Sequence, residues 1–157
     1  MAQSAPRHSN GELYLEDLYT GLRFSSATHA VDEQQIKAFA RAFDPQPFHL
    51  DDAAAKATLF GGLAASGWHT AAVTMRLLFG GGAPIAGGII GAGAEIAWPN
   101  PTRPGDILRV ESEILSVTPS RSRPDRGTAT LSSQTLNQRD EVVQTLTAKL
   151  IVPRRPS

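Results

Sequence analysis

The chain has 157 residues, which is enough for one domain with a substantial hydrophobic core. Its 15 lysine and arginine residues balance its 15 aspartate and glutamate residues, so the charge indicates neither a nucleic-acid partner nor an anionic membrane surface. The absence of cysteine excludes disulfides and thiolate chemistry. No apolar run approaches the roughly 18 residues of a membrane span, and residues 1–10 lack a signal-peptide core, so we expect a cytoplasmic protein.

The first strongly predicted helix follows a weak strand at residues 22–30. Asp32 is a suitable N-cap, and Gln35 lies three residues later, where it can complete a capping box. The apolar residues that follow recur at helical spacing, so this helix is expected to bury one face. It should end near Phe43, because Pro45 disfavours helical geometry in the residue before it.

The segment that follows this helix, residues 44–49, has the sequence DPQPFH. Because each proline disfavours helical geometry in the preceding residue, we predict an extended loop here. The prolines also reduce the entropy that is lost when side chains on the loop are held still. Asp51 and Asp52 are then expected to cap a short helix at residues 52–58.

A second helix is predicted at residues 64–79, and it is built almost entirely of small and apolar residues. Its larger side chains Trp68, Met75 and Phe79 share one face, and no face is strongly polar. A helix that is apolar nearly all round is enclosed by other structure, here most simply a sheet. We therefore expect Trp68 and Trp98 to lie in the core, although Trp68, next to Gly67, could instead line an acyl tunnel.

The rest of the chain is predicted to form strands. They are expected at residues 88–98, 107–117, 128–137 and 141–152. A change of apolar face near Leu115 suggests a β-bulge, and the turn at residues 101–106 is expected to be structural. Successive strands pair antiparallel, so we predict an α+β fold in which the sheet curls around the helix at 64–79.

Three of these segments resemble the MaoC-like (R)-specific enoyl-CoA hydratases and dehydratases, which have the hotdog fold. DPQPFH is similar to the family's D-x-N-P-x-H signature, with Gln46 in place of the usual asparagine. Ser66 and Gly67 resemble the start of its central helix, and PTRPGD at residues 101–106 resembles its P-x-x-P-G-D turn. The resemblance implies a flexible segment at residues 1–19, one domain at 20–153 and a tail at 154–157.

The resemblance also implies an activity and its residues. The expected reaction is hydration of a trans-2-enoyl-CoA, or dehydration of the (R)-3-hydroxyacyl-CoA, in fatty acid metabolism. Asp44 and His49 would together activate one water molecule. The N–H of Gly67, at a helix N-terminus, would hold the thioester oxygen, and the glycine would let that oxygen approach closely. Ser66 would add a hydroxyl group or cap the helix. Coenzyme A would be part of the substrate, with no separate cofactor or metal.

Other functions remain open from the sequence. A hotdog acyl-CoA thioesterase commonly has a carboxylate on the central helix, and residues 64–79 contain none. A non-catalytic acyl-binding domain is a further alternative. A metal site would draw on acidic residues and the histidine of residues 44–52, but their spacing matches no established ligand pattern. His69 is expected to be a packing histidine.

Two predictions concern binding partners. The arginines of the loop at 119–127 (Arg121, Arg123 and Arg126) could bind the phosphates of coenzyme A, or could belong to a solvated hairpin loop, which we favour. The free edge of the sheet is expected to pair with a second copy of the chain. The resulting homodimer would have the acyl tunnel at its interface and could assemble further.

Overall fold

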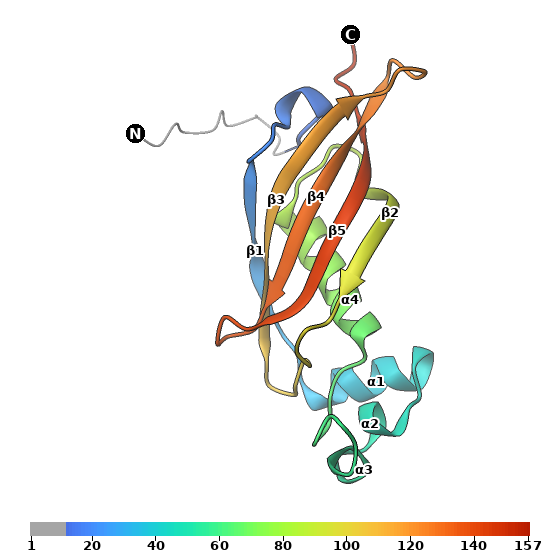
Figure 1. Cartoon of the computed structure of the whole chain (residues 1–157), viewed down its shortest axis with the longest axis vertical. Helices are drawn as coiled ribbons and strands as arrows, with labels where there is room; N and C mark the ends of the chain where they lie inside the picture. Colours follow the sequence, from blue (N-terminus) through green and yellow to red (C-terminus); the bar gives the residue numbers. More distant parts are fainter. Residues whose placement is uncertain (1–11) are drawn as a thin grey trace.

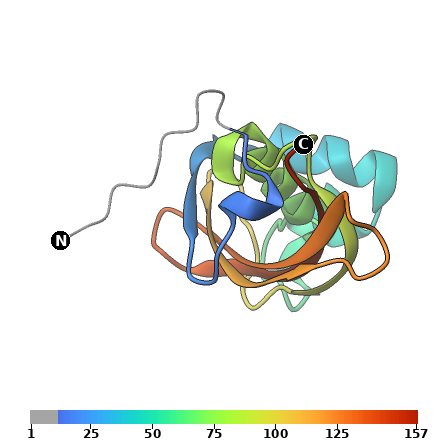
Figure 2. The same cartoon turned by 90° about the horizontal axis from the view of Figure 1, so that it is seen from above.

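A five-stranded antiparallel sheet curls around helix α4, as Figures 1 and 2 show. This computed structural model describes residues 12–157; residues 1–11 of the predicted N-terminal segment lie outside the described residues. The strand order in the sheet is β1-β3-β4-β5-β2. The strands are β1 (Arg23–Ala30), β2 (Ile90–Ala97), β3 (Ile107–Pro119), β4 (Arg126–Leu136) and β5 (Val142–Pro153). The helices are α1 (Glu33–Phe43), α2 (Pro47–Leu50), α3 (Asp52–Lys56) and α4 (Gly67–Leu77), with single turns η1 (Leu15–Asp17) and η2 (Leu78–Gly82).

The core lies between α4 and the concave face of the sheet. Along β3 and β4, buried and less buried residues alternate, so every second side chain points toward the helix. From the helix, Val73 and Leu77 are buried in the same cluster as Leu108 and Leu131 of the sheet. The predicted α+β arrangement, with the sheet wrapped around this helix, is confirmed. The predicted bulge is also confirmed, as a register shift between Ile114 and Ser116.

Helix α1 begins and ends where the sequence predicts. The Asp32 side chain accepts a hydrogen bond of 2.8 Å from the backbone N–H of Gln35, and the helix ends at Phe43. The prediction that the Gln35 side chain completes a capping box is wrong. The Gln35 side chain turns away from the cap and bonds the backbone oxygen of Ala30 and the ring of His29 instead.

The loop at residues 44–49 is only partly extended. Its second half forms the short helix α2, which starts at Pro47. Proline is well tolerated in the first turn of a helix, because the N–H that it lacks has no partner within the helix there. Pro47 disfavours helical geometry only in the residue before it, and Gln46 is indeed extended. A helix can still begin at the proline itself.

Helix α4 is shorter than predicted, and part of its surface is exposed. It begins at Gly67 rather than at residue 64, because the N–H groups of Ala64 and Ala65 bond outside the helix, to the carbonyl groups of Phe48 and Thr102. Trp68 and Phe79 are 59% and 72% exposed, so their predicted place in the core is wrong. Trp98, at 39% exposed, is not a core residue either. Val73, Thr74 and Leu77 of α4 are buried, whereas Trp68 and Met75 face outward.

The packed domain begins before the predicted boundary at residue 20. Leu15 and Leu18 are buried in the core cluster, so residues 12–19 are not a flexible segment. Leu15 packs against Gly127. A Cβ added at Gly127 would lie only 2.5 Å from Cδ2 of Leu15. The C-terminal tail is held as well, since Arg154 bonds Glu16 at 3.0 Å and Arg155 pairs with Asp17. The turn η1 and the C-terminal tail thus meet at the end of the sheet away from α1–α3 (Figure 1).

Within residues 12–157, no helix has both the length and the apolar character needed to cross a membrane.

Candidate active site

Asp44 and His49 lie side by side at the end of the molecule where α1, α2 and α3 gather. The backbone N–H of Asp44 closes the last turn of α1, and the short helix α2 then turns the chain so that His49 points back. The distance between Asp44 Oδ2 and His49 Nε2 is 3.3 Å. The side chains are 15% and 5% exposed, respectively. The structure therefore brings together the acid and the imidazole that the sequence predicts to act on one molecule.

The orientation of the His49 ring is set by a backbone carbonyl group. His49 Nδ1 lies 2.7 Å from the oxygen of Ala64. A carbonyl oxygen can only accept a hydrogen bond, so Nδ1 carries the proton and donates it. In the neutral ring, Nε2 then has a free lone pair, and this is the atom that faces Asp44. The rings of Phe48 and Phe60 pack against the imidazole, with centroids 4.6 and 5.8 Å away.

The carboxylate of Asp44 is held by two side-chain donors. Ser66 Oγ donates to Oδ2 at 2.7 Å, and Gln46 Nε2 donates to Oδ1 at 2.6 Å. Burial raises the pKa of the Asp44 carboxyl group. The hydrogen bonds from Ser66 and Gln46 lower it by more, aided by the nearby imidazole, so the pKa falls below its ordinary value of 3.8. Gln46, which replaces the family's asparagine, thus serves as a brace for the Asp44 carboxylate.

Ser66 has both of the roles that the sequence left open. Its Oγ donates to Asp44 and also accepts a 3.3 Å hydrogen bond from the backbone N–H of Trp68, which makes it the N-cap of α4. Ser66 is fully buried. It therefore holds the carboxylate at the start of the helix and does not face the cavity.

Gly67 is the first residue of α4, where the backbone N–H has no partner within the helix. We expected this glycine to make room for the thioester oxygen, but the structure gives another reason for it. A Cβ at Gly67 would lie 2.6 Å from Cε2 of the Trp98 indole ring, so the space beside its Cα is already filled. Trp98 Nε1 is in turn hydrogen-bonded to Gln144 Oε1 at 3.0 Å.

A cavity of about 410 Å³ opens beside these groups. Its lining comes from four parts of the chain: α2 with the segment after α3, the start of α4, the segment after β2, and Val143 of β5. The residues that matter for its chemistry and walls are Gln46, His49, Phe60, Gly67, Thr70 and Trp98. Asp44 is not among the lining residues. A ligand in the cavity therefore meets His49 and Gly67, the first residue of α4.

The other candidate residues do not join this site. Asp51 caps α3 by accepting from Ala53, and Asp52 accepts from the N–H of Leu63. Within residues 12–157, no group of three or more histidine or acidic side chains is arranged to hold a metal ion. The loop at 119–127 lies at the opposite end of the sheet from α1–α3 (Figure 1), which favours the predicted solvated hairpin loop over a contact of its arginines with coenzyme A.

His69 is a packing residue, as predicted. It is buried and its ring stacks on Phe39 of α1 with centroids 4.9 Å apart. Burial lowers the pKa of the His69 imidazole. The contact joins α1 to α4, so it supports the site from outside the cavity.

The sequence missed two residues at the site. Trp98 was expected in the core, but in the structure it forms a wall of the cavity. Arg103 was expected only to be part of a structural turn. Trp98 follows a strand and precedes two prolines, which is typical of a residue at the exposed end of a sheet. No local pattern indicates its contact with Gly67, because the two residues are far apart in the sequence.

Comparisons with known proteins agree with this architecture. The family model of the MaoC like domain matches residues 20–136. The crystal structure of the MaoC-like dehydratase from Rhodospirillum rubrum is 66% identical, with a TM-score of 0.91 over 92% of this chain and 99% of that one. The R-hydratase PhaJ1 from Pseudomonas aeruginosa, in its unliganded form, is 26% identical, with a TM-score of 0.72 over 92% and 88% of the two chains. The predicted hotdog fold is confirmed.

A relative is also found by sequence. Uncharacterized protein YdeM of Bacillus subtilis (strain 168) is 32% identical over 129 residues, which cover 80% of this chain and 89% of that protein. The similarity thus extends over almost the whole length of both proteins.

Replacing Gly67 with alanine should destabilise the protein, because the new methyl group would overlap the Trp98 indole. Overpacking of this kind typically costs about 1–3 kcal/mol. Gly80→Ala is the matched control, since a Cβ there meets nothing within 4 Å and its φ is −75°. Denaturant unfolding of both variants measures the difference. Equal free energies of unfolding would show that the indole does not require glycine at position 67.

Proposed function

Because this chain belongs to the MaoC-like domain family, we propose that it hydrates trans-2-enoyl-CoA thioesters to (R)-3-hydroxyacyl-CoA and catalyses the reverse dehydration. Membership of the family supports an enzyme of the hydratase or dehydratase kind. The observation that carries the specific proposal is the pairing of Asp44 with His49 beside a cavity that also contains Gly67. Coenzyme A is part of the substrate, and no other cofactor is proposed.

The acid and the imidazole suit the binding of one water molecule. In the neutral ring, both Asp44 Oδ2 and His49 Nε2 are hydrogen-bond acceptors, and they lie 3.3 Å apart. A water molecule that donates one hydrogen to each of them satisfies both groups. Its own lone pair then points into the cavity, toward the β-carbon of a bound enoyl group. Attack by this oxygen forms the new carbon–oxygen bond.

The same nitrogen can carry the proton that the water loses. Hydrogen bonds lower the pKa of the Asp44 carboxyl group, so it favours the ionised form and stabilises positive charge on the nearby ring. The proton of the attacking water therefore passes to His49 Nε2, and Nε2 then delivers it to the α-carbon of the substrate. One water is consumed and the ring returns to its starting form.

The negative charge that develops on the thioester oxygen needs a donor. The unpaired N–H of Gly67 lies at the positive end of α4 and lines the cavity. A single donor of this kind can contribute roughly 3 kcal/mol to the stability of the transition state. Trp98 closes the other side of Gly67, so the oxygen approaches the N–H from the cavity.

Thioesterase activity fits the same cavity less well than hydratase activity does. Helix α4 (GWHTAAVTMRL) has no acidic side chain that could attack a thioester or activate water from the helix. The carboxylate of the site is instead Asp44, which is held by two donors and paired with an imidazole. This arrangement suits proton transfer better than nucleophilic attack.

We also propose a homodimer that forms through β2 and the outer face of α4. Strand β2 is an edge strand that pairs only with β5, and its side chains are small or apolar apart from Glu95. The other edge strand, β1, has mainly polar side chains. The exposed α4 residue Trp68 contacts Trp98 just after β2, with ring centroids 5.2 Å apart, so the two elements form one apolar surface. Further assembly of the dimer and a cytoplasmic location stay predictions.

Replacing Asp44 with asparagine or His49 with alanine should lower kcat by roughly 10²–10⁴-fold, the usual contribution of a general acid or base. The assay follows the loss of the conjugated enoyl absorbance for trans-2-enoyl-CoA substrates of increasing acyl length. Asp51→Asn is the control, because asparagine caps a helix as well as aspartate does. Free thiol release by the wild type without hydration would contradict the proposal and favour a thioesterase.

Replacing Ser66 with alanine should move the acid limb of the pH profile of kcat/KM to higher pH. The Ser66 hydroxyl lowers the pKa of the Asp44 carboxyl group, so its loss raises that pKa, and the carboxylate is protonated at a higher pH. Asp32→Ala is the control, because it removes the cap of α1 without touching Asp44. An acid limb at the same pH in Ser66→Ala and wild type would show that Asp44 ionisation does not govern activity.

Replacing Met75 with glutamate should weaken the dimer without unfolding the chain, because Met75 is 45% exposed on the outer face of α4. Leu115→Glu is the matched control, since Leu115 is 44% exposed but lies on β3, away from the proposed interface. Light scattering coupled to size exclusion measures the mass of each variant. A monomeric wild type, or a Met75→Glu dimer as stable as that of Leu115→Glu, would contradict the proposed interface.

A further inference from the structure

The segment at residues 60–64 sets the position of His49, yet it has no regular secondary structure of its own. At one end, the Phe60 ring packs near the His49 ring, with centroids 5.8 Å apart. At the other end, the Ala64 oxygen accepts the proton of His49 Nδ1 at 2.7 Å. A shift of this segment would therefore move both the wall beside the imidazole and the acceptor that fixes its tautomer.

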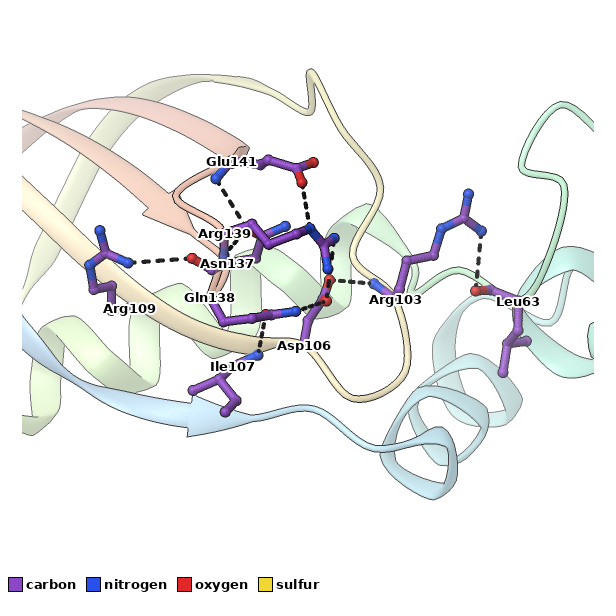
Figure 3. Close-up of polar contacts among 9 residues, drawn as sticks. All are labelled: Leu63, Arg103, Asp106, Ile107, Arg109, Asn137, Gln138, Arg139 and Glu141. Atoms are coloured by element: carbon purple, nitrogen blue, oxygen red, sulfur yellow. Dashed lines mark hydrogen bonds and ion pairs between the residues drawn. The ribbon is translucent and has the colours of Figure 1, made fainter.

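One side chain from a distant part of the sequence holds this segment. The Arg103 guanidinium donates from Nη1 to the oxygens of Gly62, at 2.9 Å, and Leu63, at 3.3 Å. Its Nη2 donates to the oxygen of Phe60. Within residues 60–63, three of the four backbone carbonyl groups are thus oriented by one planar cation, and Gly61 is the exception. Figure 3 shows the Arg103 side chain reaching from its turn to Leu63.

Arg103 is itself anchored to the sheet. Its backbone N–H donates to Asp106 Oδ2 at 2.8 Å, and Asp106 is 2% exposed. The other carboxylate oxygen of Asp106 accepts from Gln138 Nε2 at 2.9 Å, in the turn between β4 and β5. The Gln138 side-chain oxygen accepts from the N–H of Ile107, the first residue of β3 (Figure 3). The guanidinium therefore projects from a point that is fixed to three strands.

We propose that Arg103 is a positioning residue for catalysis, which sets the orientation and tautomer of the His49 ring through residues 60–64. It touches neither His49 nor the cavity; it acts through the carbonyl groups that it binds and through Ala64, the next residue in the segment. The kinetic part of this inference rests on the proposed hydratase function, whereas the effect on the ring does not.

Arginine suits this task better than lysine. Its donors lie in a rigid planar fork, so one side chain can bond several oxygens in fixed directions. A lysine ammonium at the same place can donate to one or two of the carbonyl groups, but it cannot fix the spacing between them. Arg103→Lys should thus retain part of the effect, and Arg103→Met should lose it.

The test compares Arg103→Met and Arg103→Lys with Arg109→Met. Arg109 is a matched control because it too bonds a backbone carbonyl group, that of Asn137 at 3.3 Å, together with Asp140 at 2.6 Å. These contacts are on the side of the network away from the segment 60–64 (Figure 3). Each variant is measured for unfolding temperature, for kcat and KM, and for the ¹⁵N shifts of the His49 ring, which His49→Ala identifies.

We expect kcat of Arg103→Met to fall by roughly 10–100-fold with little change in KM, because a displacement of about 1 Å at a catalytic group can cost about 10²-fold. The His49 spectrum should show a larger share of the tautomer protonated on Nε2 and faster exchange of the Nδ1 proton. Arg103→Lys should lie between Arg103→Met and wild type. Arg109→Met should keep the wild-type kcat and ring spectrum.

Two results would overturn the inference. The first is that Arg103→Met folds and its His49 ring has the wild-type tautomer and exchange rate. If Arg103→Met does not fold, the same result in a folded Arg103→Lys has the same meaning. The second is an equal change in the His49 spectrum in Arg109→Met. A lower unfolding temperature alone, without a change at the ring, would show that Arg103 only stabilises the loop. If the wild type hydrates no enoyl thioester, the proposed function fails, and the ring spectrum still decides the role of Arg103.

Discussion

The hydroxyl group of Ser66 joins the central helix to the acid of the site, and the rest of the geometry depends on it. Through one oxygen it caps α4 by accepting from Trp68 and fixes the carboxylate of Asp44 by donating to it. The next residue is Gly67, which lines the cavity. The carboxylate and the proposed oxyanion donor are therefore held in a fixed relation by adjacent residues of one chain segment, and His49 must be brought to them.

The rotation of α4 about its own axis is fixed by polar contacts within the core. Thr70 bonds Thr102 at 2.9 Å, Thr74 bonds Thr135 at 2.6 Å, and Gln144 donates to Thr74 at 3.0 Å. Hydrogen bonds between buried side chains are directional, whereas apolar contacts allow small rotations. These bonds turn the face that carries Thr70 and Thr74 toward the sheet and leave Trp68 and Met75 outside, where a second subunit is proposed to cover them.

Local sequence patterns predicted the parts of the site that lie close together in the chain. DPQPFH placed Asp44 and His49 on one short segment, and the Ser66–Gly67 pair placed the start of a helix. They did not predict which face of α4 is covered, because residues that are apolar all round can be enclosed by a sheet or by a partner subunit. The contact of Trp98 with Gly67, and that of Arg103 with residues 60–63, arise from tertiary packing and have no local signal.

Gln46 illustrates how the site tolerates a change in its signature. Its side chain is one methylene longer than the family's asparagine, yet its amide still donates to Asp44, only two residues away. The extended backbone at Gln46, imposed by Pro47, directs the side chain back over the preceding residue and takes up the added length. What the site requires at this position is an amide donor that keeps the half-buried carboxylate ionised. A signature written in residue types therefore understates the sequences that can build the same acid–imidazole pair.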